Sequence, residues 1–193
     1  PQELVELLLR DRQFYEVSGG GVTLSGGEPT LQQAFCGELL ALLKRAHIHT
    51  AVETNGLFAW EAFAAACLPH LDLVLFDVKL IDPLRHQRAV GAGNALILAN
   101  LARLVALRPQ DVVVRVPLIP GWTADAANLG GIAAHLRNLG VQRVSLLPYH
   151  PHGLDKAARV GRAVPPDLPP QPMDQASQEA CRRLFAGCTL VPA

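Results

Sequence analysis

The sequence predicts an α/β fold in which a parallel sheet carries its helices on the outside. Two observations predict it. Segments with strand spacing alternate about five times with segments of helical spacing, and polar residues recur where each predicted strand ends. The chain has 193 residues, half of them hydrophobic, which suffices for a substantial core. We therefore expect a single domain over residues 1–193.

The predicted strands are short apolar or β-branched runs that end in glycine, proline or a polar turn. They cover residues 22–24, 49–54, 71–78, 111–119, 143–148 and 188–191. The run 71–78 is nearly continuously apolar, which is typical of a strand buried on both faces. The run 49–54 ends at Asn55-Gly56, a pair that favours a turn.

The predicted helices have apolar residues three or four positions apart. They cover residues 3–10, 31–46, 60–67, 94–107, 124–139 and 174–185. Gly140 follows one of them and is expected to be its C-cap. The proline-rich run 165–172 predicts an extended connector to the last helix.

Composition narrows the function classes. Acidic and basic residues balance at 17 each, so no basic excess points to nucleic acid or to an anionic membrane. No apolar run reaches membrane-spanning length, and the first residues do not resemble a signal peptide. The four cysteines are widely spread, as reduced thiols of a cytoplasmic protein would be. The chain opens on Pro1 and enters a helical pattern without a preceding strand, so we expect a piece of a longer protein.

The run Gly26-Gly27-Glu28-Pro29 directly after the first predicted strand is the most informative local feature. Glycines allow positive φ and let a ligand lie against main-chain groups. Pro29 removes a donor and holds Glu28 extended. This arrangement suits a loop that grips a small polar molecule by its backbone-like end.

Polar residues also lie in or directly after the last residues of the other predicted strands, except Arg115, which lies within its strand. They are Glu53, Thr54, Asp77, Lys79, Arg115 and His150. Ligands of (β/α) barrels and open α/β sheets bind at the edge where parallel strands end. We therefore expect a ligand site at this edge.

Each of these residues also has a structural interpretation. Glu28 could cap a helix N-terminus, since a helical stretch begins soon after it. Asp77 and Lys79 share a strand face and could form an ion pair. Arg115 could neutralise a neighbouring carboxylate, and His150 could be an ordinary loop histidine.

Several segments carry a family resemblance when taken together in this order. They are residues 14–29, 53–56, 77–79, 91–94, 97–101, 115–122 and 146–150. They resemble the glycyl-radical-enzyme activases, the pyruvate formate-lyase activating enzyme group of the radical S-adenosylmethionine (SAM) superfamily. The resemblance covers nearly the whole chain. It implies a partial (β/α)6 barrel of the TIM type from which the first strand and the cluster loop are absent.

The resemblance implies a cofactor site at matching positions. The implied residues are Gly26, Gly27, Glu28, Glu53, Thr54, Asp77, Val78, Lys79, Arg115 and His150. The backbone of the glycine loop would hold the methionine amino group of SAM, and Lys79 would bond its carboxylate or ribose. Arg115 would lie close to the cofactor or the substrate peptide, and His150 near the ribose or adenosine end.

A monovalent cation site is also implied. Glu53 and Asp77 would face it, with Thr54 and the Leu75 carbonyl as further candidates. Carboxylates opposite a sulfonium and an ammonium, and a lysine opposite a carboxylate, are favourable in a dry cleft.

The resemblance also implies the chemistry and the partners. The cofactors would be SAM and a [4Fe-4S] cluster, and the resulting 5′-deoxyadenosyl radical would take a hydrogen atom from a glycine of a partner glycyl radical enzyme. A flavodoxin or a ferredoxin-type protein would supply the electron. No nucleic acid or membrane partner is expected.

One departure from the family pattern is large. The family's cluster ligands come from a Cys-x3-Cys-x2-Cys loop upstream of the glycine loop. Only 25 residues precede Gly26 here, and none is cysteine. Cys36 and Cys67 lie on predicted helices and cannot replace a three-thiolate loop. We expect truncation rather than natural loss, and a fragment that is inactive alone.

Two other functions remain open at this point. Lys79 could be the amine of a Schiff-base lyase on a (β/α) barrel. The chain could also be a non-catalytic, partner-binding remnant that has lost its cluster.

Overall fold

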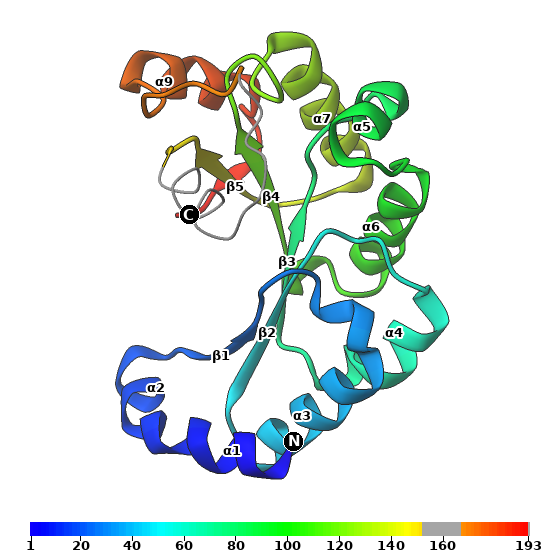
Figure 1. Ribbon diagram of the computed structural model, residues 1–193, viewed down its shortest axis with the longest axis vertical. Helices are drawn as coiled ribbons and strands as arrows, with labels where there is room; N and C mark the ends of the chain where they lie inside the picture. Colours follow the sequence, from blue (N-terminus) through cyan, green and yellow to red (C-terminus); the bar gives the residue numbers. More distant parts are fainter. Residues whose placement is uncertain (152–166, 193) are drawn as a thin grey trace. The chain divides into compact units, whose positions relative to one another are not determined.

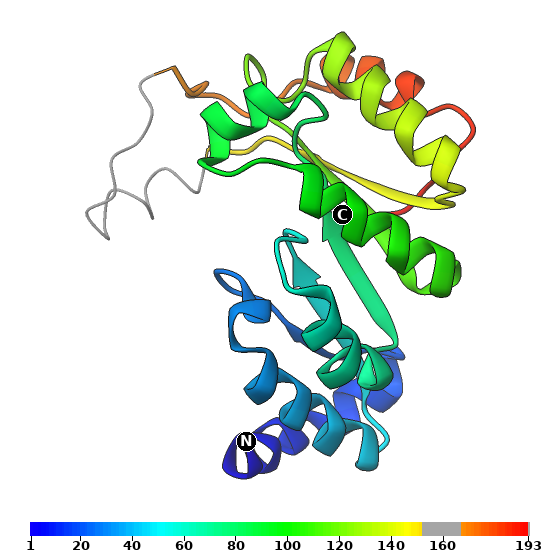
Figure 2. The same cartoon turned by 90° about the vertical axis from the view of Figure 1, so that its right-hand side faces the viewer.

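The computed structural model describes residues 1–151 and 167–192 (Figures 1 and 2). Six strands follow one another in one sheet in the order β1-β2-β3-β4-β5-β6. The expected α/β class is therefore confirmed. The chain divides into two compact units, the first unit being Pro1–Asp77 with Ala95–Val113, and the second Val78–Asn94 with Val114–Ala193. That residues 1–193 act as a single domain stays a prediction.

The first unit contains the first three strands and most of the early helices. Its strands are β1 (Gly21–Leu24), β2 (His49–Thr54) and β3 (Leu73–Asp77), and its helices are α1 (Gln2–Leu8), α2 (Arg12–Ser18), α3 (Gln33–Arg45), α4 (Trp60–Ala66) and α6 (Ala95–Leu107). Both strand pairs are parallel. In Figure 1, α1 lies against α3, and α3 against α4.

Register places the side chains of this unit on two faces. Val22 pairs with Thr50, and Thr54 pairs with Phe76, so these four share a face. That face is covered by helices, because Val22 packs with α1 and α3 in a cluster made by Val5, Val22, Leu39, Leu43 and Ile48. Glu53 pairs with Leu75 on the opposite face.

The second unit contains most of β4 (Val112–Leu118), which begins in the first unit. It also holds α5 (Pro83–Val90), α7 (Ala126–Leu139), β5 (Arg143–Pro148), α9 (Gln175–Leu184) and β6 (Thr189–Leu190). β5 and β6 pair in parallel. Figure 2 shows α7 and α9 side by side. The predicted cap Gly140 is confirmed, with φ at +74° after α7.

Most predicted elements are confirmed within a few residues, and three differences have physical reasons. The helix expected from residue 31 begins at Gln33, because the chain first makes a 3-10 turn over Pro29–Gln32. Helices α2 and α5 were not predicted, because neither has an apolar stripe. Helix α2 buries no residue, and α5 buries only His86. The prediction that β3 is buried on both faces is wrong, because alternate residues such as Leu75 are partly exposed.

The prediction of an extended connector over 165–172 is only partly tested. Residues 165 and 166 lie outside the described residues, and 167–172 form turns and bends without helix or strand. In the part of the chain that the structure describes, no single helix is long and apolar enough to cross a membrane; only α5 and α6 counted together meet that length and composition.

Gly56 gives a direct test of packing in the first unit. Its φ is +79°, and a Cβ there would overlap the Phe76 ring. Gly56→Ala should therefore lower the free energy of unfolding by at least about 3 kcal/mol. Gly19→Ala is the matched control, because Gly19 also has positive φ, at +67°, but open space around it. It should cost about 1–2 kcal/mol. Urea unfolding measures both, and equal losses would contradict the packing argument.

Candidate functional site

The glycine loop after β1 presents its main chain openly. Gly26 and Gly27 are both exposed, and no atom lies within 4 Å of where a Cβ would stand at either position. Gly26 has φ at +120°, a conformation that side chains disfavour. The main chain of the pair is therefore exposed, and its use by a ligand stays a prediction.

The Glu28 side chain is engaged within the protein. Its Oε1 accepts hydrogen bonds from Thr30 N at 3.2 Å, Thr30 Oγ1 at 2.6 Å and Thr54 Oγ1 at 2.8 Å. Its Oε2 accepts one from Asn55 N at 2.7 Å. The carboxylate thus caps the 3-10 turn and fastens the glycine loop to the end of β2. The capping interpretation therefore describes the Glu28 side chain, and ligand binding by the main chain of this loop stays a prediction.

The other predicted residues of the first unit lie on opposite faces of the sheet. Glu53, Leu75 and Asp77 share the face that the helices do not cover, by register and alternation. Glu53 Oε2 accepts a 2.6 Å hydrogen bond from Ser25 Oγ, beside the glycine loop. Thr54 is 2% exposed on the helix-covered face, so its hydroxyl points away from that set.

In the second unit, the residue directly after β3 is still bonded to β4. Val78 N donates to Arg115 O at 2.9 Å, which continues the strand hydrogen bonding. The Val78 side chain is 2% exposed, whereas Lys79 and Arg115 are partly exposed. His150 is exposed and follows Tyr149, whose hydroxyl donates to Pro169 O at 2.9 Å.

Buried asparagines hold the loops of the second unit. Asn128, in the first turn of α7, bonds the backbone of Lys79, Ile81 and Thr123. Asn94 Nδ2 donates to the carbonyls of Leu80 and Ile81. Reasoning from the sequence missed both. In the sequence, each could have been recognised as an asparagine at the start of a helix whose other residues are mostly apolar.

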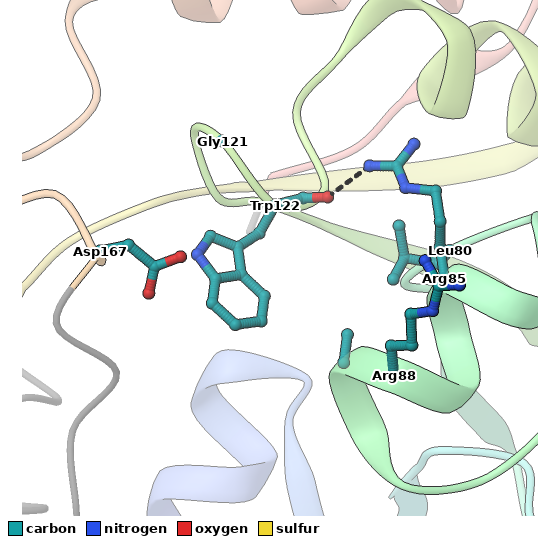
Figure 3. A pocket seen from close by; sticks show the side chains of 7 residues that line it. Leu80, Arg85, Arg88, Gly121, Trp122 and Asp167 are labelled. Carbon is teal, nitrogen blue, oxygen red and sulfur yellow. Dashed lines mark hydrogen bonds between the residues drawn. The ribbon is translucent and has the colours of Figure 1, made fainter.

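A pocket of about 310 Å³ lies beside this network, on the loop after β4 (Figure 3). Its lining residues are Leu80, Arg85, Arg88, Ala89, Gly121, Trp122 and Asp167. Arg85 Nη2 donates to Trp122 O at 2.9 Å and to Asp125 Oδ2 at 2.7 Å. In Figure 3 the Trp122 indole projects from its loop toward Asp167. Arg85 therefore ties α5 to the loop that carries the indole.

The cysteines of the first unit are buried thiols. Cys36 Sγ donates to Pro29 O at 3.2 Å, and Cys67 Sγ to Gln33 O at 3.5 Å. Burial raises the pKa of Cys36 above its ordinary value, and burial together with the neighbouring Cys36 raises the pKa of Cys67 to about 11. Protonated thiols bind metals poorly. Among residues 1–151 and 167–192, no three His, Cys, Asp or Glu side chains are grouped to hold a metal ion.

Removing the Glu28 carboxylate tests its structural role. Glu28→Ala leaves Asn55 N and two threonine hydroxyls without their acceptor, so it should lower the free energy of unfolding by about 3 kcal/mol. Glu16→Ala is the control, because Glu16 makes only an exposed ion pair with Arg12 and should change stability by under about 0.5 kcal/mol. Urea unfolding compares them. A Glu28 effect as small as the control would refute the bridging role.

Acid should weaken the Arg85–Asp125 pair. The Arg85 hydrogen bond lowers the pKa of Asp125 below its ordinary 3.8, with burial opposing and Asn128 N–H assisting. A lowered folded pKa gives stability that is present above pH 3.8 and lost as pH falls through the folded value. Asp125→Asn keeps the helix cap but not the charge.

Because both side chains are about two-fifths exposed, the variant should cost under about 1 kcal/mol at pH 7. That cost should shrink as the pH falls below 3.8 and disappear once the pH is below the lowered pKa of folded Asp125. Urea unfolding from pH 7 to pH 3 measures it, and a difference that stays constant with pH would count against the pair.

Comparison with known proteins now assigns the fold. The chain matches the Radical SAM superfamily over residues 1–128. It is 45% identical over 164 residues to the isethionate sulfite-lyase activating enzyme of Nitratidesulfovibrio vulgaris, covering 84% of this chain and 53% of that protein. It is 36% identical over 186 residues to the pyruvate formate-lyase-activating enzyme of Staphylococcus aureus, covering 93% and 74%.

A solved structure agrees. The crystal structure of a domain of pyruvate-formate lyase-activating enzyme from Bacteroides vulgatus superposes with a TM-score of 0.73 and 28% identity, covering 90% of this chain and 99% of that one. The chain spans about half the length of the isethionate relative. By sequence and by fold, the chain belongs to the radical SAM superfamily, in the group of glycyl-radical-enzyme activating enzymes.

Proposed function

We propose that this chain is the SAM-binding part of an activating enzyme, which in its full-length form removes a hydrogen atom from a glycine of a partner enzyme. Family membership supports the proposal. The observation that carries it is the exposed glycine pair at the end of β1, whose main chain is open while Glu28 anchors it to β2. The loop is thereby fixed in place and left accessible.

The residues present fit the amino-acid end of SAM. Backbone groups at Gly26 and Gly27 would hold the methionine amino group, and the Lys79 ammonium would bond the carboxylate or the ribose. Glu53 and Asp77 would place negative charge on the open sheet face, toward the sulfonium or a monovalent cation. Arg115 and His150 would approach the substrate peptide and the adenosine end. When bound together, SAM and a reduced cluster supply one-electron chemistry.

The described residues do not fit a [4Fe-4S] cluster. The thiols of Cys36 and Cys67 are buried, bonded to carbonyls and raised in pKa. The proposed cluster ligands therefore belong to the part of the full-length protein that this chain does not span, as the 53% coverage of the isethionate relative suggests. No step through the cluster follows from these residues.

The partner is proposed from the relatives. The relatives' names give isethionate sulfite-lyase and pyruvate formate-lyase as the enzymes that they activate. A glycyl radical enzyme is thus the proposed protein substrate of this chain's full-length form, with a flavodoxin or a ferredoxin-type protein as reductant. The cytoplasmic location and the absence of nucleic acid or membrane partners stay predictions. The relatives support this function over a Schiff-base lyase that uses Lys79.

The full-length enzyme tests the proposal. After anaerobic cluster reconstitution and reduction with dithionite, it should release 5′-deoxyadenosine from SAM. Lys79→Ala should raise the KM for SAM about tenfold or more, because one charge-assisted hydrogen bond is worth about 1.5–3 kcal/mol. Lys44→Ala is the control, since Lys44 pairs with Asp72 at 2.6 Å, beside the start of β3. No 5′-deoxyadenosine from the reconstituted enzyme would overturn the assignment.

A further inference from the structure

The Asn128 side chain occupies the position that a neighbouring strand would take. Its Nδ2 donates to Lys79 O at 3.0 Å, and its Oδ1 accepts from Ile81 N at 2.9 Å. In a parallel ladder one residue donates to position i−1 and accepts from position i+1 of its neighbour. The Asn128 amide makes this same pair of bonds around Leu80.

This amide extends strand geometry beyond the end of β3. Val78 N is bonded to Arg115 O, and two of the backbone groups that follow, Lys79 O and Ile81 N, are bonded to Asn128. Burial alternates accordingly, with Val78 at 2% and Leu80 at 3% exposure while Lys79 between them is partly exposed. Because side chains alternate along extended chain, this geometry sets the direction of the Lys79 side chain.

Asn128 is itself held firmly. It is 2% exposed, its N donates to Asp125 Oδ1 at 2.9 Å, and its second amide hydrogen bonds Thr123 O at 2.9 Å. A Cβ at Gly131, one turn later in α7, would stand 2.9 Å from Ile81 Cγ2. The absence of a side chain there lets α7 approach closely enough for the amide to reach the backbone.

We propose that Asn128 is a positioning residue, whose amide substitutes for a strand neighbour and so aims Lys79 at its ligand. The inference rests on the proposed role of Lys79 in binding SAM. It predicts that the two residues act through one interaction rather than independently.

A double-mutant cycle in the full-length, cluster-reconstituted enzyme tests this, with SAM affinity measured by isothermal titration calorimetry. Lys79→Ala and Asn128→Ala should each weaken binding about tenfold, and the double variant should bind no more weakly than Lys79→Ala alone. Hydrogen exchange gives a second readout: the Ile81 amide should exchange at least tenfold faster in Asn128→Ala.

Two further variants separate positioning from general stability. Asn128→Asp keeps an acceptor for Ile81 N but loses the donors to Lys79 O and Thr123 O, so it should weaken SAM binding and serves if Asn128→Ala does not fold. Thr123→Val removes a buried hydroxyl bonded to Pro117 O and Ile119 N in the same loop. It should lower the melting temperature but change SAM affinity less than twofold.

The outcomes distinguish the two proposals. If Lys79→Ala binds SAM normally, the proposed role of Lys79 fails, and the positioning inference fails with it. If Lys79→Ala weakens binding but the foldable Asn128 variants do not, or if the effects simply add, the positioning inference is overturned while the role of Lys79 stands.

Discussion

Buried backbone groups that leave a strand must still find hydrogen-bond partners, and this requirement shapes the loops of the candidate site. The Glu28 carboxylate serves Asn55 N at the end of β2. Asn100 Nδ2 serves the carbonyls of Gly56 and Phe58 in the next loop. Asn94 and Asn128 do the same after β3. Each of these loops is therefore held by one or two polar side chains, and the three asparagines among them are buried.

These interactions hold loop backbone, such as that of Asn55 and Lys79, that belongs to no helix or strand. A lost partner would leave a buried donor or acceptor unsatisfied, at a cost of about 1–3 kcal/mol each. In the second unit, Asp82 and Asp125 cap α5 and α7, and Asn128 lies in the first turn of α7. The helix caps and the loop bonds therefore form one connected network in the second unit.

The sequence predicted the α/β class and each of the six strands that the described residues form, because apolar spacing and glycine turns report these features locally. It failed at α2 and α5, whose few buried residues leave no apolar stripe. The sequence grouped Glu28 with the two glycines as one ligand-binding loop. In the structure the Glu28 side chain instead accepts a hydrogen bond from Thr54, 26 positions away. It missed Asn128, whose partner Lys79 is 49 positions away. Contacts of this range depend on the packing of α7, which spacing alone does not encode.

In the glycine loop the main chain is exposed, while the Glu28 side chain supports the loop from within. This difference limits how substitutions could alter what the loop binds. Where recognition relies on peptide groups alone, side-chain substitution can change it little, and the Glu28 and Ser25 side chains beside the glycines already make hydrogen bonds within the protein. Recognition by backbone groups suits the part of a ligand that is the same in every reaction of the family. On the proposed role of this loop, new preferences for a protein partner would arise from other surfaces of the molecule, while the amino-acid end of the cofactor would be held in the same way throughout.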